Sequence, residues 1–399
     1  MIQEKAEKIL KQPVCDNCLG RQFSRLLSGY TNEERGKAIR NAIAMDVDAA
    51  TSFGEMDASN FSSCGMRNVK APAEKECSIC KNVFARLGSY AKAAVTKAKH
   101  IEYSTFLVGT RPSSELVYGE EALWENVGID FCEPIKGEIN RETGKKIEKL
   151  SGKKFSPKGD VIFLIDMDSG KVEVSIAPVF IYGEYQKLKR GIPQTKWPSG
   201  KYKTSVEQII AKPYMAATRA EAHKLHGAGR EDIDARCLAW RPFVLELLGA
   251  KKRAIDIAKL AKKIGKEVRV RNLRLSNIVE VRSIKDARYD KTYRAKVKCG
   301  PVKRAALKKL SVLSAIAQKT PKRVLHRRAD LTRKRLVKSV KTRFINSKAF
   351  ELIVRGESGL YIKELISGDD GRTKPSVSEL LGVPCKCAEL DVIDIHVKK

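Results

Sequence analysis

The feature that most constrains the fold of this chain is a pair of Cys-x-x-Cys motifs in its first hundred residues. Cys15 and Cys18 form the first motif, Cys77 and Cys80 form the second, and 58 residues separate the two. This spacing lets both thiolates of each motif face one Zn²⁺ ion, and four thiolates around one ion are usual in structural zinc modules. The gap is longer than the roughly 15–20 residues of a simple zinc ribbon. We expect a structural Zn²⁺ that ties two distant loops together, with unligated thiols or a redox motif as the alternatives.

The distribution of charge is the second constraint. Between Lys251 and Lys348 the chain has 33 Lys and Arg residues and 6 Asp and Glu residues, so nearly all of its net charge of +31 lies there. A folded segment with this charge repels itself unless a polyanion partner offsets it. Binding to phosphate groups is the usual use of such a surface, so we expect a nucleic acid partner. A membrane surface is the weaker alternative, because the segment lacks a continuous apolar helical face with aromatic anchors.

The pattern along the 399 residues predicts an α+β protein of two or three domains. Residues 1–100 read as a zinc-binding helical part, and residues 101–199 alternate strands with one amphipathic helix. Residues 200–399 read as mostly antiparallel strands with helices on one side, and KWPSGKYKT is the expected linker between the last two regions. No apolar run has the roughly 18 residues of a spanning helix, and the start lacks a signal peptide. We therefore expect a cytoplasmic protein that does not enter a membrane.

A dense polar cluster lies between His226 and Arg236, where two glycines precede alternating acids and arginines. The pattern suggests a tight loop that leads into the strand RPFVLEL. Spacing alone does not say which acid is functional, and a surface network of ion pairs worth about 0–1 kcal/mol per exposed pair is the alternative.

Three motifs here resemble those of pseudouridine synthases, in the same order along the chain. GREDIDAR followed by RPFVLEL resembles the motif that carries the single catalytic aspartate of these enzymes. KTYRA resembles the motif whose tyrosine stacks on the target base, and GLYIKEL resembles the motif whose basic residue pairs with the aspartate.

The resemblance narrows to one group and covers essentially the whole chain. CDNCLGRQFSRLLSGYTNEERGKAIR, KLKRGIPQTKWP and LYIKELISGDDGRTKPSVSELLG are similar to the archaeal and eukaryal type of tRNA pseudouridine synthase that acts on positions 54 and 55 of the T arm. That group joins an N-terminal, zinc-binding half with a THUMP domain to a C-terminal catalytic half. The resemblance implies a pseudouridine synthase fold at residues 200–399 and a THUMP-like module at residues 101–199.

The resemblance also assigns roles to single residues. Asp232 would be the catalytic residue and Asp234 its structural neighbour. Tyr293 would stack on the uracil, and Lys363 would pair with Asp232. Further residues expected to contact the substrate or to form the pocket wall are Arg230, Leu360 and Ile362.

The basic segment at about residues 300–345 would be an RNA-binding insert of the catalytic half. Our candidates for contacts near the base are His326, Arg327 and Arg328. We expect tRNA as the partner, no obligate protein partner, and no organic cofactor, because an aspartate can act here as a nucleophile or as a base. The alternative function is a catalytically silent tRNA-binding protein or RNA chaperone.

Overall fold

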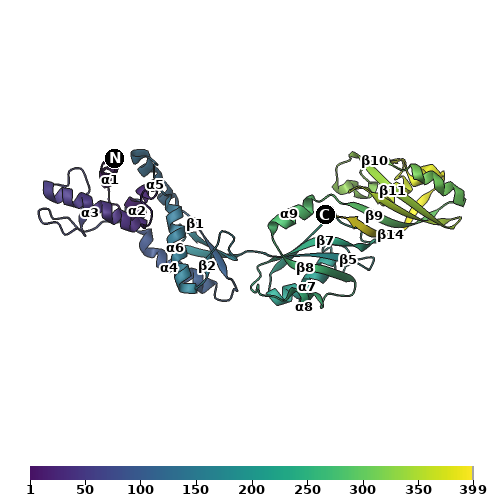
Figure 1. Ribbon diagram of the computed structural model, residues 1–399, viewed down its shortest axis with the longest axis horizontal. Coiled ribbons are helices and arrows are strands. Elements are labelled where there is room, and N and C mark those ends of the chain that lie inside the picture. Colours follow the sequence, from purple (N-terminus) through teal and green to yellow (C-terminus); the bar gives the residue numbers. More distant parts are fainter. Residues whose placement is uncertain (398–399) are drawn as a thin grey trace. The chain divides into compact units, whose positions relative to one another are not determined.

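The structure is a computed structural model that describes residues 1–397, apart from the side chain of Arg327. It divides into an N-terminal unit, Met1–Ala177, and a C-terminal unit, Pro178–Lys399. Each unit is described by itself below (Figure 1).

The boundary between the units lies earlier than the expected one near residue 200. The apolar run KVEVSIAPVFIYGEY contains the strand β4 (Lys171–Ile176) and most of the strand β5 (Val179–Lys187), on either side of Ala177 and Pro178. β4 pairs with a strand of the N-terminal unit, and β5 pairs with two strands of the C-terminal unit. The expected linker KWPSGKYKT is therefore a loop inside the C-terminal unit.

The N-terminal unit places helices on one face of a small sheet. Its strands follow the order β2-β1-β3-β4, with β1 parallel to β2 and β3, and β3 antiparallel to β4. Alternate side chains of β1 and β3, among them Phe106 and Phe163, are buried. Helix α6 packs against β1, and α4 packs against β4 and α6 (Figure 1). One hydrophobic core runs from Ala6 to Val172, so the helical start and the strands share it. The elements are α1 (Ile2–Ile9), α2 (Asp16–Gly20), the 3-10 helix η1 (Arg21–Phe23), α3 (Asn32–Ala50), η2 (Ala58–Phe61), α4 (Val83–Lys97), β1 (Thr105–Arg111), α5 (Ser114–Val127), α6 (Ile135–Ser151), β2 (Lys154–Phe155), β3 (Val161–Asp166) and β4.

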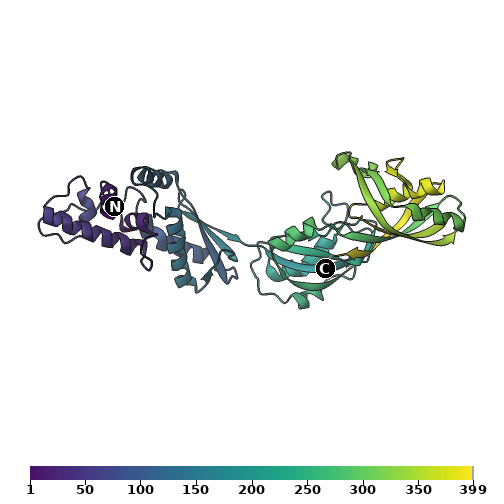
Figure 2. The ribbon, with the colours of Figure 1, turned by 45° about the horizontal axis from the view of Figure 1, so that its top comes forward.

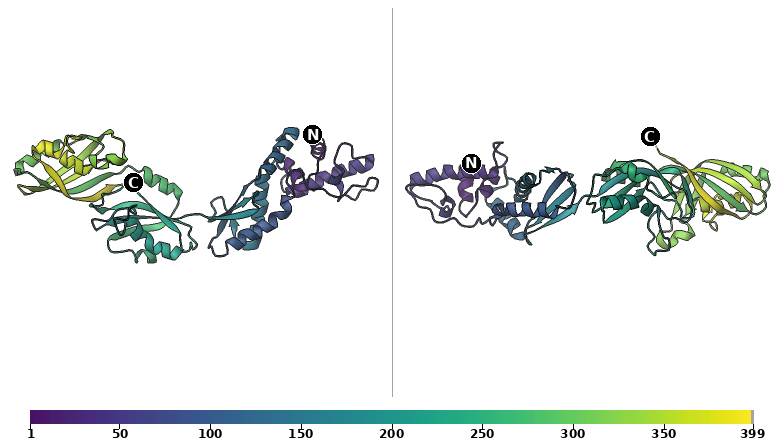
Figure 3. Two further views of the ribbon diagram at one scale, coloured as in Figure 1. Left: turned by 180° about the vertical axis from the view of Figure 1, so that it is seen from behind. Right: turned by 90° about the horizontal axis from the view of Figure 1, so that it is seen from below.

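The C-terminal unit is built on one large sheet, and the path through it is β13-β10-β11-β12-β9-β14-β7-β5-β8, with β6 paired to β7. Its pairings are antiparallel except between β14 and β7, which confirms the expected mostly antiparallel sheet. Figures 2 and 3 show its two halves, one of strands coloured green to yellow and one of teal strands. The elements after β5 are α7 (Val206–Thr218), β6 (Ala222–Gly227), β7 (Arg236–Leu248), α8 (Ile257–Ala261), β8 (Val268–Ser276), α9 (Ile278–Asp286), β9 (Asp290–Cys299), η3 (Arg304–Val312), β10 (Ala315–Lys319), η4 (Lys322–Arg327), β11 (Thr332–Asn346), β12 (Ala349–Gly356), α10 (Ile362–Ser367), β13 (Thr373–Lys374), α11 (Val377–Leu381) and β14 (Cys385–His396).

The basic segment at about residues 300–345 is part of the sheet rather than a separate insert. β10 and β11 pair with each other, and β11 continues the sheet by pairing with β12. Some apolar residues of the segment, such as Leu310 and Ile316, are buried in the same core as α10 and α11. Part of the apolar periodicity therefore serves packing, while most of the lysines and arginines whose side chains the structure describes in this segment are exposed.

Helices α2 and α3 approach each other through two glycines. A Cβ atom on Gly20 would lie 1.8 Å from the carbonyl oxygen of Asn32, and one on Gly36 would lie 2.0 Å from that of Asp16. Real side chains do not come this close to backbone atoms, so the crossing depends on both glycines.

We predict that Gly36→Ala destabilises the N-terminal unit by about 1–3 kcal/mol, because the added methyl group forces the two helices apart. The matched control is Gly88→Ala in α4, where nothing lies within 4 Å of the added carbon. That change should stabilise the unit by about 0.5–1 kcal/mol, since alanine is the better helix former. Urea unfolding followed by circular dichroism measures both effects, and a Gly36→Ala variant as stable as Gly88→Ala would contradict the close crossing.

Candidate active site

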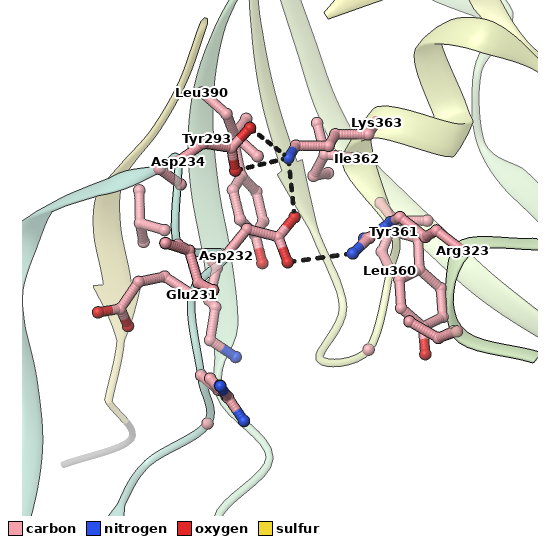
Figure 4. Close-up of a pocket in the computed structure, with 18 of the residues that line it drawn as sticks. Glu231, Asp232, Asp234, Tyr293, Arg323, Leu360, Tyr361, Ile362, Lys363 and Leu390 are labelled. Carbon is pink, nitrogen blue, oxygen red and sulfur yellow. Dashed lines mark hydrogen bonds and ion pairs between the residues drawn. The ribbon is translucent and has the colours of Figure 1, made fainter. Parts of the chain in front are cut away.

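A pocket of about 650 Å³ lies where the two halves of the large sheet meet, at the start of β7 and beside β14 (Figure 4). It is formed by the loop before β7, by β9 and β14, by η4, and by the turn into α10. The lining residues are Trp197, Gly229–Ala235, Lys291, Tyr293, Arg323, Val324, Arg328, Ser358–Lys363, Leu390 and Val392.

The carboxylate of Asp232 lies between two cations in this pocket (Figure 4). The Lys363 ammonium nitrogen is 3.2 Å from its Oδ2, and Nη1 of Arg323 donates to its Oδ1 at 3.2 Å. The same ammonium group donates to both carboxylate oxygens of Asp234, at 2.7 and 2.8 Å. Asp232 remains about one third exposed, so it is reachable from the pocket.

The charges of this cluster support one another. Burial alone would raise the pKa of Asp234, but the hydrogen bond from Lys363 and its charge outweigh burial and lower it. Burial likewise opposes the charge on Lys363, yet the bond to Asp234 and the charge of Asp232 raise its pKa. Arg323 is held from its other side by Glu364, to which its Nε donates at 2.7 Å. The cluster therefore keeps two cations beside Asp232, while among the described residues Asp234 is paired with Lys363 alone.

A buried lysine at the end of β5 fixes the loop that carries Asp232. Lys187 is fully buried, and its ammonium group donates to the carbonyl oxygens of Ile192, Asp232 and Ile233 at 2.9, 3.0 and 3.2 Å. Burial lowers the pKa of Lys187, because the charged ammonium group loses its hydration there. The three hydrogen bonds fix the ammonium group and, because two of the carbonyl groups belong to Asp232 and Ile233, they also fix the loop.

A buried ion pair supports the start of the same loop. The Arg241 Nε lies 3.1 Å from Oε2 of Glu231, and both side chains are fully buried. Nη1 of Arg241 also donates to the carbonyl of Ala228 at 2.7 Å, while the Tyr185 hydroxyl donates to Glu231 at 3.0 Å. Gln194 completes the network, because its Nε2 donates to the Tyr185 oxygen and to the carbonyl of Gly229. The residues on either side of Asp232 thus have fixed positions.

An aromatic ring and aliphatic side chains supply the apolar wall. Tyr293 lies on β9 with its ring toward Asp232 (Figure 4), and burial raises its pKa to about 12. Leu360, Ile362 and Leu390 line the pocket around it. A flat apolar ring next to an acid and two cations suits a planar, polar ligand.

The structure brings together most of the residues expected from the sequence. Asp232, Tyr293, Leu360, Lys363 and Arg230 all line the pocket, and so does Ile362. Arg328 lines it as well and donates to the Tyr361 hydroxyl at 2.6 Å. His326 is exposed on η4 and is not among the described lining residues, and the side chain of Arg327 lies outside the described residues.

Sequence reasoning missed Arg323, the second cation on Asp232. It lies in the run KRVLHRR, where several basic residues in succession give no sign of which one turns inward. It also missed Lys187, the first residue of the run KLKRGIPQ. This run resembles the family, but its pattern does not indicate that Lys187 supports the loop that carries Asp232.

The four cysteines of the two Cys-x-x-Cys motifs come together in the N-terminal unit. Cys15 precedes α2, Cys18 lies within it, and Cys77 and Cys80 lie in the turn before α4. Their sulfur atoms are all within 4.8 Å of one another, and three of the four residues are buried. Nη1 of Arg21 donates to the Cys18 sulfur at 2.8 Å. This set of donors fits a single metal ion.

Among the described residues, no helix is both long and apolar enough to cross a membrane.

We predict that Lys187→Met lowers the free energy of unfolding by about 2–4 kcal/mol, because three carbonyl groups lose the hydrogen bond from this ammonium group and Glu231 loses a nearby cation. Amide exchange in residues 230–235 should accelerate. Lys189→Met, at an exposed position two residues away, is the control and should change neither quantity. Equal stability of the two variants in urea would show that Lys187 does not hold the loop.

Comparison with known proteins identifies the family. The family model described as "Pus10, C-terminal" matches residues 180–396, and "Pus10 THUMP domain, archaeal" matches residues 90–166. A protein named tRNA pseudouridine synthase Pus10 from Methanothrix thermoacetophila is 39% identical over 96% of this chain and 92% of its own length. Its namesake from Pyrococcus furiosus is 39% identical over 99% of this chain and 98% of its own.

Solved structures add a distant likeness. A crystal structure of a Cbf5-Nop10-Gar1 complex aligns with 52% of this chain and 47% of its own at 17% identity and a TM-score of 0.32. The family models and the relatives confirm the resemblance found in the sequence. The chain therefore belongs to the Pus10 family and is a pseudouridine synthase, an isomerase with a THUMP domain in its N-terminal unit.

Proposed function

We propose that this enzyme converts uridine to pseudouridine in the T arm of tRNA, at position 54, position 55 or both, with Asp232 as the catalytic residue. The observation that carries the proposal is the accessible carboxylate of Asp232 in a pocket beside Lys363, Arg323 and the ring of Tyr293. The relatives named tRNA pseudouridine synthase support tRNA as the substrate.

The reaction breaks the C1′–N1 bond of uridine, turns the detached uracil and joins C1′ to C5. C5 then loses its proton and N1 gains one, so the product is an isomer of the substrate. Asp232 acts either as a nucleophile on C1′ or as a base at C2′. Lys363 orients the carboxylate and balances its charge, and Tyr293 stacks on the base.

The target base must leave the stacked T arm before it can reach the pocket, at a cost of a few kcal/mol. Basic groups at the pocket can repay this cost by contact with phosphates, which position the RNA without reading its sequence. Arg230 and Arg328 are exposed and line the pocket, so we assign them to the nucleotides around the target. His326 is a more distant contact of the same kind.

We assign catalysis to the C-terminal unit and further tRNA contacts to the N-terminal unit with its THUMP domain. The metal held by Cys15, Cys18, Cys77 and Cys80 is Zn²⁺ in a structural role, because four thiolates leave no position open for a substrate. No organic cofactor is needed for the isomerisation, and the cytoplasm is the expected place of action. The tRNA is the only partner that the proposal requires.

To test the activity, an unmodified tRNA transcript is incubated with the protein, and pseudouridine is mapped by carbodiimide treatment and primer extension. We expect pseudouridine in the T arm with the wild type, and a rate reduced by at least about 10³-fold with Asp232→Asn. The comparison variant is Asp234→Asn, which keeps Asp232 and should therefore retain more activity than Asp232→Asn.

Tight tRNA binding without pseudouridine would favour the silent binding protein instead. Activity that survives in Asp232→Asn but not in Asp234→Asn would move the catalytic role to Asp234.

For the metal, we predict one zinc atom per chain by elemental analysis. Removal by a strong chelator should unfold the α2–α4 region, because the ion ties the loop at Cys15 to the turn at Cys77. Cys77→Ser should lose both the zinc and helical circular dichroism. Cys132→Ser, outside the four-cysteine cluster, is the control and should keep its zinc. A folded, fully active protein without metal would contradict the structural role.

A further inference from the structure

A buried lysine in the pocket has no part in the mechanism above. Lys291 lies on β9, two residues before Tyr293, and is only 7% exposed, yet it lines the pocket. Within the described residues its ammonium group makes one hydrogen bond, to the carbonyl of Tyr289 at 3.3 Å, and no ion pair. An ammonium group has three donors, so two of them have no protein partner.

Protein groups pack against Lys291, so its two remaining N–H donors can find an acceptor only in the pocket. A Cβ atom on Gly229 would lie 3.4 Å from the Lys291 nitrogen, so the loop before Asp232 lies directly against it. Across the sheet, Lys291 pairs with Gly356, and the side chain of Leu360 fills the space over that glycine.

The charges around Lys291 do not neutralise it. The buried cation Arg241 lies close by, since its Nη1 is 3.3 Å from the same position on Gly229. Cys237 on β7 and Asp290 on β9 are the other titratable groups that act on Lys291. Asp290 already accepts hydrogen bonds from Lys338 and Arg355. Burial, with Arg241 adding to it, lowers the pKa of Lys291 to about 8.

The position of Lys291 relative to Tyr293 indicates what the ligand is. Side chains two residues apart on a strand lie on the same face, about 6–7 Å apart along it. A uracil stacked on Tyr293 would therefore turn one edge toward Lys291, and both carbonyl oxygens of uracil are at its edge. Asp232 faces the same ring, where the sugar would lie (Figure 4).

We propose that Lys291 is a further catalytic residue, which donates a hydrogen bond to a carbonyl oxygen of the flipped uracil and offsets the negative charge that the base acquires during the reaction. This inference rests on the proposed function. When the C1′–N1 bond breaks, its electron pair goes to the base, and the charge spreads onto the carbonyl oxygens. A cation fixed in a largely dry site stabilises that charge more than the neutral base of the substrate, which lowers the barrier. Lys291 itself makes and breaks no covalent bond.

The test is single-turnover kinetics of Lys291→Met on the tRNA transcript, with Lys298→Met as the control. Lys298 lies on the same strand and is exposed. We expect Lys291→Met to lower the rate constant of the chemical step by about 10²-fold, with the Kd for tRNA changed less than about twofold. Lys298→Met should leave the rate constant of the chemical step unchanged. Because methionine removes an unpaired buried charge, the Tm of Lys291→Met should not fall.

The pH profile separates a charge effect from a structural one. The dependence of kcat/KM on pH reports the free enzyme. Because the pKa of Lys291 is lowered to about 8, its charged fraction falls as the pH rises through that region. The advantage of the wild type over Lys291→Met should therefore shrink as the pH rises from about 7 to about 9.

Three results would overturn the proposal while the enzyme remains active. One is a Lys291→Met rate constant within about twofold of the wild type. The second is a raised Kd with an unchanged rate constant, which would make Lys291 a phosphate contact. The third is a loss by the same factor at every pH together with a lower Tm, which would make it structural support. A wild type that forms no pseudouridine overturns the proposed function and this inference with it.

Discussion

The position of Asp232 depends on charges that are buried beneath it. A loop between two strands has few backbone hydrogen bonds of its own, and this one receives them from Lys187, Arg241 and Gln194. Burying two cations and Glu231 costs solvation free energy that the ion pair and hydrogen bonds only partly return. The result is a loop that is fixed on both sides of the Asp232 carboxylate before any ligand binds, which is the kind of preorganisation that a site for chemistry requires.

Much of this site could be predicted from the sequence, because several of its residues lie in short local motifs. Asp232, Tyr293 and Lys363 lie in short runs whose order matches the family, and the structure places all three in one pocket. Arg323 could not be found in this way, since only the path of the chain between β10 and β11 turns that one arginine toward Asp232.

The fold shows the same division between local and distant determinants. Periodicity predicts the antiparallel strands. Local composition predicts the unit boundary near residue 200, where proline, glycine and charged residues occur together. The actual division follows Ala177, because pairing partners distant in sequence assign β4 to one sheet and β5 to another. Likewise the net charge of the segment around residues 300–345 predicted an RNA-binding insert, although its buried leucines belong to the core of the sheet.

The pairing of β14 with β7 and β9 has a consequence for synthesis of the protein. β14 lies between strands that precede it by many residues, and it supplies Leu390 and Val392 to the pocket. A nascent chain on the ribosome can form the loop with Asp232 long before β14 emerges, but the two halves of the sheet are then not joined. Translation must therefore pass residue 392 before the wall of this pocket is complete.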